Sequence, residues 1–268
     1  MGPILLSKRR PLGIMIKRPK GRASLPQELS AIGHHLVFAE GTKTELSYAK
    51  SIEKAILSKY LVDPEVSHVE IIEVDHRKKA LDTIRLLDYA EQEITQRISQ
   101  GERIDYVWVF FDKDDYHFAD FQSAIARIER KNKSEYQERN LNNDPCDKNG
   151  IHWTACFSNR CFELWPCLYF CYFQSTVSAC DDYIEQINQF LKKANPDCRY
   201  EKTSEGLHQT LVSAKGSLDN AIRYGRKLRQ KNGINEPSTG ISDFAYYFKN
   251  YLRTDEEEKE GEHHGIIR

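Results

Sequence analysis

Acidic residues occur at three places in this chain where each follows or interrupts an apolar run. They are Glu40 and Glu45 in HLVFAEGTKTE, Asp112, Asp114 and Asp115 in YVWVFFDKDD, and Glu163 in SNRCFELW. Carboxylates that crowd together beside buried residues repel one another unless a cation neutralises them. If the fold brings these groups to one place, they predict a divalent-metal site and therefore phosphate chemistry.

The segment DKDD places two carboxylates at alternate positions directly after a strongly apolar run. Alternate residues of an extended chain point to the same side, so Asp112 and Asp114 can face one cation. Oxygen ligands of this kind suit Mg²⁺ or Mn²⁺. A calcium loop of the EF-hand type is excluded, because His117 and Ser123 stand where such a loop requires glycine and glutamate. From this motif alone, a polar turn with solvated aspartates remains the alternative.

The other acids each have a second interpretation. Glu40 precedes Gly41 and a threonine-capped helix, so it can hold a metal beside free backbone N–H groups or simply cap that helix. Glu45 suits the first turn of the same helix, where the helix dipole favours an acid. Glu163 either faces the site or belongs to a helix start near Ser158.

The elements that must position these acids alternate between strand and helix. Apolar runs predict strands over residues 35–39, 69–74, 106–111 and 151–157, and helical spacing predicts helices over 44–60, 80–98 and 118–128. The run 106–111 is apolar on both faces, which is typical of a central parallel strand. We therefore expect an α/β fold, a doubly wound and mainly parallel sheet with helices on both faces. Such sheets bind ligands at the carboxyl ends of their strands, where the acids are expected.

The second half of the chain is predicted to be helical. Residues 158–173 are typical of one buried helix capped by Ser158 or Asn159, and further helices are expected over 183–194, 207–214, 218–230 and 241–252. The predicted organisation is a basic flexible arm (1–30), an α/β catalytic core (31–175), a helical C-terminal part packed on the core (176–253) and an acidic disordered tail (254–268).

Composition limits the partners. The net charge of −1 removes any global electrostatic argument for nucleic acid. Seven lysines and arginines nevertheless crowd residues 8–22 without an acid, so that this arm is either a solvated tail or a contact for phosphate.

No apolar run is long enough to span a bilayer, and the apolar residues of MGPILLSKRR precede its charges, the reverse of a signal peptide. The seven cysteines form no CxxC pair, so we expect buried reduced thiols, with a zinc site as the alternative, and a cytoplasmic location.

The acidic motifs, in this order, resemble a known family. EGTKTE, FDKDD and SNRCFELW resemble the patterns EGxxTE, xFDxDD and SNPxFExW of the RloB-like proteins, and NEPSTGISDFAYYFKNYL resembles their closing segment. The resemblance covers about residues 31–253 and departs at Arg160, where proline is usual. It implies a Toprim-like fold in which Glu40, Asp112 and Asp114 bind Mg²⁺ (or Mn²⁺). Asp115 is then the additional acid of this family.

The resemblance also implies a function. It predicts a metal-dependent nuclease of bacterial anti-phage defence that cuts RNA, such as transfer RNA, or DNA, with an ABC-type ATPase as partner and a homo-oligomer as one expected state. Glu45 and Glu163 join the catalytic candidates. The alternatives are a non-cleaving subunit that senses nucleic acid or nucleotide, and primase-type transfer, for which the sequence offers no nucleotide pocket.

Overall fold

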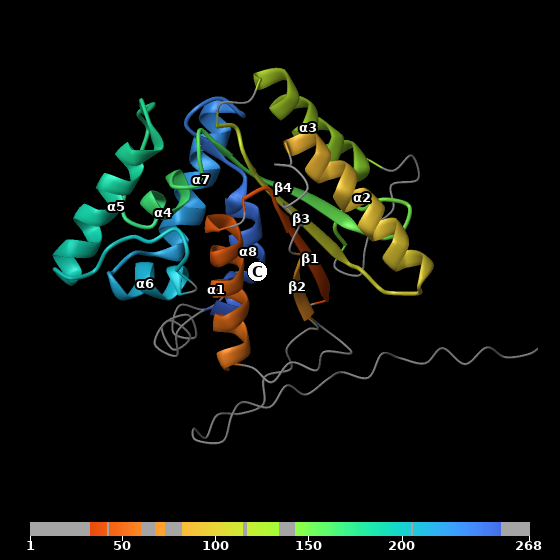
Figure 1. The fold of residues 1–268 in the computed structure, drawn as a ribbon, viewed down its shortest axis with the longest axis horizontal. Coiled ribbons are helices and arrows are strands. Elements are labelled where there is room, and N and C mark those ends of the chain that lie inside the picture. The colour runs from red at the N-terminus through yellow and green to blue at the C-terminus, as the bar shows by residue number, and fades with distance from the viewer. Residues whose placement is uncertain are drawn as a thin grey trace, which may run out of the picture.

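The computed structural model describes residues 33–41, 43–59, 68–72, 82–114, 117–133, 143–204 and 206–252. Its strands form a five-stranded sheet in the order β2-β1-β3-β4-β5 (Figure 1). Strands β1 to β4 are parallel and β5 is antiparallel to β4, so the predicted α/β fold is confirmed. In chain order the elements are β1 (His34–Ala39), α1 (Thr44–Lys59), β2 (His68–Ile72), α2 (Thr83–Ser99), β3 (Tyr106–Asp112), α3 (Phe118–Lys131), β4 (His152–Asn159), α4 (Leu164–Leu168), α5 (Cys180–Ala194), α6 (Leu207–Ser213), α7 (Leu218–Asn232), β5 (Ser238–Thr239) and α8 (Ile241–Leu252).

Strand β3 lies at the centre of the sheet between β1 and β4. Its apolar residues are buried on both faces, as a continuous hydrophobic run in a parallel sheet requires. Phe110 and Phe111 are both 0% exposed, and truncation of either to alanine would cost about 3–5 kcal/mol. The register pairs Phe110 with Ala39 and Asp112 with Ser158, which brings the carboxyl ends of β1, β3 and β4 to one edge of the sheet. We call this the carboxyl edge.

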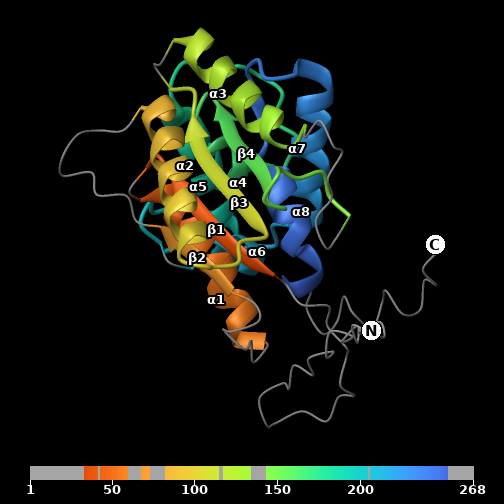
Figure 2. The same cartoon turned by 90° about the vertical axis from the view of Figure 1, so that its right-hand side faces the viewer.

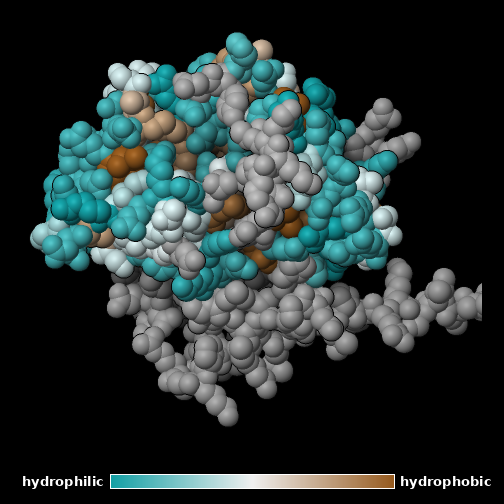
Figure 3. All heavy atoms as spheres, in the orientation of Figure 1, coloured by the Kyte–Doolittle hydropathy of each residue, from teal (hydrophilic) through white to brown (hydrophobic). Residues whose placement is uncertain are grey.

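Alternate side chains of each strand enter two separate cores. Leu36, Val107 and Val109 pack with helices α2 and α3, whereas Val37 and Trp108 pack with α1 and the helices α4 to α8. Figure 2 shows α2 and α3 in front of the sheet, with α8 and α7 beside it. The face seen in Figure 3 is mostly hydrophilic, with hydrophobic residues only in small separate patches.

Two helices begin at the carboxyl edge for local reasons. Asp82 caps α2, since its side chain accepts a hydrogen bond from the backbone N–H of Arg85 at 2.9 Å. Helix α1 begins at Thr44, soon after Gly41, and has Glu45 in its first turn. Both helix starts therefore lie next to the residue that follows β1.

The single buried helix predicted over residues 158–173 is wrong. Strand β4 continues to Asn159, because Ser158 pairs with Asp112 on one side and with Thr239 of β5 on the other. Helix α4 then spans only Leu164–Leu168. The two-residue strand β5 was not predicted, because it is too short to show a period of two.

The expectation that the cysteines are reduced is also corrected. Cys161 and Cys180 form a disulfide across Cα atoms 6.2 Å apart, because the loop after β4 and the start of α5 meet there. Cys146, Cys156 and Cys167 are free and buried.

The predicted basic arm (1–30) and the predicted acidic tail (254–268) lie outside the described residues. Within the described ranges, none of the helices combines the length and the apolarity needed to cross a membrane.

Candidate active site

Glu40 lies at the carboxyl edge directly after β1. Its backbone N–H donates to the carbonyl oxygen of Phe110 at 2.9 Å, which ties it to the end of β3. Its Oε2 accepts a hydrogen bond from Thr83 Oγ1 of α2 at 3.2 Å. The side chain is thus oriented by elements on both sides of β1, toward the start of α2.

Asp112 is the last residue of β3 and the centre of the acidic group. Its Oδ2 accepts a hydrogen bond from the backbone N–H of Phe162 at 2.9 Å. Burial raises the pKa of Asp112 well above its usual value, and the nearby charges of Glu45, Glu163 and Glu40 raise it further against the Phe162 hydrogen bond. The structure therefore brings four of the predicted site residues into one electrostatic neighbourhood, and we call these four the acidic cluster.

Glu45 is buried in the first turn of α1 and lies against Gly41. A Cβ atom at Gly41 would collide with the carboxylate of Glu45, so glycine leaves the space that this carboxylate occupies. Burial raises the pKa of Glu45 to about 7, with Glu163 raising it and both its own backbone N–H and Lys202 lowering it. A carboxyl group with this pKa exchanges protons near neutral pH.

Glu163 is only 2% exposed, at the N-terminal end of α4. Its side chain makes no capping hydrogen bond to that helix. Oε1 instead forms an ion pair with Lys202 Nζ at 2.9 Å and accepts from the hydroxyl of Tyr200 at 3.5 Å. Of the two interpretations of Glu163, the geometry favours a side chain that faces the site.

Tyr200 and Lys202 were not predicted, because they lie in an irregular segment between α5 and α6 that carries no motif. Burial raises the pKa of Tyr200, and Glu163, Glu45 and Asp112 raise it further. Burial lowers the pKa of Lys202, but the hydrogen bond and charge of Glu163 outweigh this effect and leave the pKa raised. Lys202 is therefore held as a cation beside the acidic cluster.

Asp114 is placed differently from the other predicted metal ligands. It is exposed in the turn after β3 with φ of 38°, and its backbone N–H donates to the carbonyl oxygen of Arg160 at 2.9 Å. Asp114 is not among the carboxylates that raise the pKa of Asp112. Asp115 lies outside the described residues.

A metal ion can be held where at least three His, Cys, Asp or Glu side chains bring their ligand atoms within 4.8 Å of one another. Within the part of the chain that the structure describes, Cys161, Glu163 and Cys180 form such a group, and the predicted trio of Glu40, Asp112 and Asp114 does not. The two sulfurs of that group are joined as a disulfide, so they offer no thiolate to a metal.

The oxygen atoms of the acidic cluster nevertheless have the chemistry of a site for a hard divalent cation. Glu45 and Glu163 are buried and Asp112 is half-buried, and the pKa values of Glu45 and Asp112 are raised in part by repulsion from other members of the cluster. A divalent cation would relieve this repulsion.

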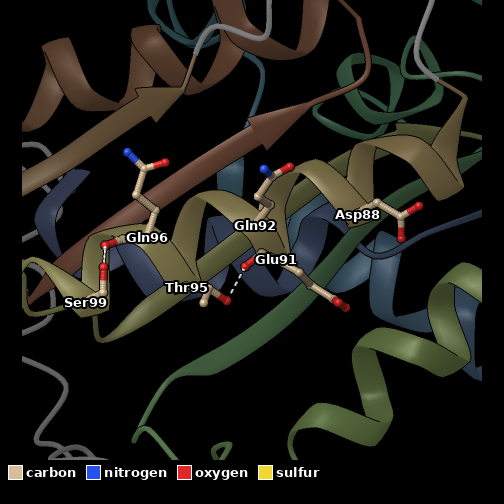
Figure 4. A pocket seen from close by; sticks show the side chains of 6 residues that line it. All are labelled: Asp88, Glu91, Gln92, Thr95, Gln96 and Ser99. Carbon is tan, nitrogen blue, oxygen red and sulfur yellow. Dashed lines mark hydrogen bonds between the residues drawn. The ribbon is translucent and has the colours of Figure 1, made fainter.

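A shallow depression of about 570 Å³ lies elsewhere, along α2 (Figure 4). Its acids are neutralised by α3, because Arg127 pairs with Asp88 at 2.8 Å and with Glu91 at 2.9 Å. This depression is therefore a polar helix surface rather than a second acidic site. Its lining residues are Asp88, Glu91, Gln92, Thr95, Gln96 and Ser99.

Comparison with known proteins identifies a family. Residues 35–245 match the family described as RloB-like protein, and this range contains the whole acidic cluster together with Tyr200 and Lys202. No curated protein and no solved structure matches the chain.

Proposed function

Because the chain belongs to the RloB-like family, we propose that it is a metal-dependent nuclease that hydrolyses phosphodiester bonds in bacterial anti-phage defence. We further propose that the chain is a member of the Toprim superfamily and that it acts in the cytoplasm. The observation that carries the proposal is that the buried acids Glu45 and Glu163 lie with the half-buried Asp112, and that the described ion pair among them joins Lys202 to Glu163. An arrangement that costs stability without a counterion is typical of a functional site.

Asp112 and Glu40 are the residues that would hold Mg²⁺ or Mn²⁺, with Asp114 as a further ligand from the adjoining turn. The cation supplies charge neutralisation at the phosphate and activation of water. The pKa of Glu45, about 7, suits it to accept the proton that the attacking water releases. The hydroxyl of Tyr200 and the ammonium of Lys202 hold the carboxylate of Glu163 beside the other acids.

The proposed substrate is nucleic acid, either RNA such as transfer RNA or DNA. An ABC-type ATPase and a second copy of the chain are the proposed partners. One observation favours a second candidate function, because Glu40, Asp112 and Asp114 do not converge within 4.8 Å in the described part of the chain. That spacing suits a subunit that senses nucleic acid or nucleotide without cutting it.

A substrate panel tests the proposal. Transfer RNA, other RNA and plasmid DNA are incubated with the protein in Mg²⁺, Mn²⁺ or EDTA, alone and with the neighbouring ATPase. We expect cleavage that requires metal, disappears in Asp112→Asn and persists in Asp88→Asn, which removes one acid from the α2 surface. Equal cleavage by Asp112→Asn and the wild type would overturn the proposal. Binding without cleavage under every condition would support the sensor.

A further inference from the structure

We propose that the outer face of α7 binds the phosphate backbone of a nucleic-acid strand and leads it to the acidic cluster. The proposal rests on the proposed nuclease function and names the surface that holds its substrate. Arg223, Lys227 and Lys231 occupy every fourth position of α7 and are exposed. Residues four apart share one face of a helix, so their charges follow one another at about 6 Å along the axis. We call these three residues the basic row.

The basic row is not neutralised by protein carboxylates. In the described ranges, none of its three cations lies within ion-pair distance of an acid. Arg223 instead donates to Asn220 Oδ1 at 2.8 Å, and Lys231 donates to Gln174 Oε1 at 3.3 Å. Neutral partners orient a cation and leave its charge available to a phosphate.

Two acids of α7 and α8 are paired with cations outside the basic row. Asp219, in the first turn of α7, binds Lys249 of α8 at 3.1 Å. Asp243 of α8 binds Arg229 and lies 3.8 Å from Arg226. Arg226 and Arg229 of α7 thus face Asp243 of α8, while the basic row makes no such pair.

Aromatic rings lie under two of the three cations. The guanidinium of Arg223 lies 4.6 Å from the centroid of Tyr224, and Lys227 Nζ lies 4.4 Å from the centroid of Tyr172. The two rings contact each other with centroids 5.4 Å apart. The rings attract the cations electrostatically and restrict their motion. Cations interleaved with aromatic rings are typical of surfaces that bind single-stranded nucleic acid.

The basic row leads to the carboxyl edge. Just beyond the C-terminal end of α7, the carbonyl oxygen of Ile234 accepts a hydrogen bond from Asn159, the last residue of β4, at 2.8 Å. The next residue, Arg160, accepts from the backbone N–H of Asp114 at 2.9 Å. Figure 1 shows the upper end of α7 near the end of β4. A strand bound along α7 would therefore reach the end of β4, which pairs with Asp112 through Ser158, and the turn that carries Asp114.

The spacing and chemistry favour a polyanion with regularly repeated charges. Successive cations stand about one helical pitch apart, roughly 5–6 Å, which is comparable to the distance between neighbouring phosphates of one strand. The net charge of the chain is −1, so this attraction is local to α7 rather than a property of the whole protein.

The test measures binding without cleavage. Single-stranded RNA and DNA of equal length are titrated in EDTA at several salt concentrations against the wild type and against Arg223→Gln/Lys227→Gln/Lys231→Gln. The control is Lys192→Gln/Lys193→Gln/Lys215→Gln, which removes three exposed cations outside α7. Thermal melting checks that both variants remain folded.

We expect the α7 variant to bind at least about tenfold more weakly and to lose about 2 from the slope of log K against log salt, while the control stays near the wild type. Unchanged affinity and slope in the α7 variant would overturn the proposal. Equal displacement of the strand by polyglutamate and by a phosphate polyanion would also overturn it, since the surface would then accept any acidic partner.

The outcomes separate this inference from the nuclease proposal. If no nucleic acid is cut and the α7 variant still loses binding, the nuclease proposal fails, and the proposal that the basic row binds nucleic acid is supported. If the α7 variant binds and cuts as the wild type does, the basic row fails and the nuclease proposal stands. RNA and DNA arms of the same titration show which strand the surface prefers.

Discussion

Acidic residues are arranged in opposite ways in two regions of the molecule. One is the carboxyl edge, and the other is the surface formed by α2, α3 and the adjoining strand β2, which we call the α2–α3 surface. On the α2–α3 surface, Arg97 binds Glu70 at 2.7 Å, Glu93 at 2.7 Å and Glu102 at 3.2 Å. Glu91 in turn is bound by Lys131 as well as by an arginine of α3. Each of these acids has a cation against it.

At the carboxyl edge, the buried acids Glu45 and Glu163 and the half-buried Asp112 lie together, and Lys202 pairs with Glu163. Burial raises the pKa of Glu91 as it does that of Asp112, but Arg127 and Lys131 outweigh burial and leave the pKa of Glu91 lowered. The charged neighbours of Asp112 are acids, whereas those of Glu91 are basic residues. The pKa of Asp112 therefore rises well above its usual value. The difference teaches that neutralisation by neighbouring cations, not residue type, separates the acids of ion-pair networks from the acids for which we propose a function.

The largest expected difference between the two regions is in the cleavage rate when a glutamate of each is replaced by glutamine. Glu45→Gln should reduce cleavage by about 10²–10⁴-fold, because it removes the proposed proton acceptor. Glu91→Gln should leave the cleavage rate within about twofold of the wild type and reduce only the melting temperature. Rates on whichever substrate the panel identifies check both variants. Similar losses in the two would erase the distinction between the regions.

The pH dependence of stability should differ with and without a divalent cation. The pKa of Glu45 is raised from 4.5 to about 7 in the folded protein. The folded state then binds more protons than the unfolded state, so stability in EDTA should fall as pH rises from about 4.5 to 7 and level off above that. The rise in the pKa of this single group from 4.5 to about 7 corresponds to a loss of the order of 3 kcal/mol.

Melting curves from pH 4.5 to 8, in EDTA and in Mg²⁺, measure this effect. Mg²⁺ should stabilise the protein increasingly as pH rises, and Glu45→Gln should flatten the curve in EDTA. Stability that rises with pH between 5 and 7 in EDTA would contradict the picture of uncompensated acids.

On the α2–α3 surface, removal of a cation should cost stability and spare activity. The side chain of Arg97 is 17% exposed and binds Glu70 through two nitrogen–oxygen contacts of 2.7 and 2.9 Å. Arg97→Met should destabilise the fold by about 1–3 kcal/mol, because it leaves three acids unneutralised beside one another. Urea unfolding measures the loss, with Arg85→Met at an exposed pair as the control.

The smallest expected effect is at Lys202. Lys202→Met removes the cation that binds Glu163 and leaves the acidic cluster more negative. We expect a loss of about 1 kcal/mol in EDTA and a gain of a few-fold in Mg²⁺ affinity, since lysine and metal compensate the same carboxylates. Calorimetric titration measures the affinity. Weaker Mg²⁺ binding in this variant would show that Lys202 supports the metal site instead of competing with it.

The sequence predicted the fold because its strands carry strong apolar patterns. The run 106–111 is apolar on both faces, which predicts a central strand. The acids follow the ends of strands that were expected to be parallel, so their position at one edge of the sheet could be predicted. The roles of Glu45 and Glu163 could not, since each also suited a helix start. Only the tertiary structure shows that Glu163 faces Lys202 instead of capping α4.

Other features were hidden from the sequence for physical reasons. Tyr200 and Lys202 lie beside the acidic cluster because the segment that carries them packs against it. That segment has no periodicity and is far along the chain from Glu40. The end of β4 was placed too early, because its pairing with β5 depends on residues some 80 positions later. Contacts between residues so far apart in the sequence cannot be predicted from local sequence patterns.

Strand β5 has a consequence for the order in which the chain is synthesised. Thr239 Oγ1 and the N–H of Gly240 both donate to the carbonyl oxygen of Phe157, across 82 residues in the case of Thr239. A nascent chain therefore displays every acid of the cluster well before it contains Lys202 or the strand that closes the sheet beside β4. The ribosome must therefore release residues up to Gly240 before β5 can pair with β4 beside the site.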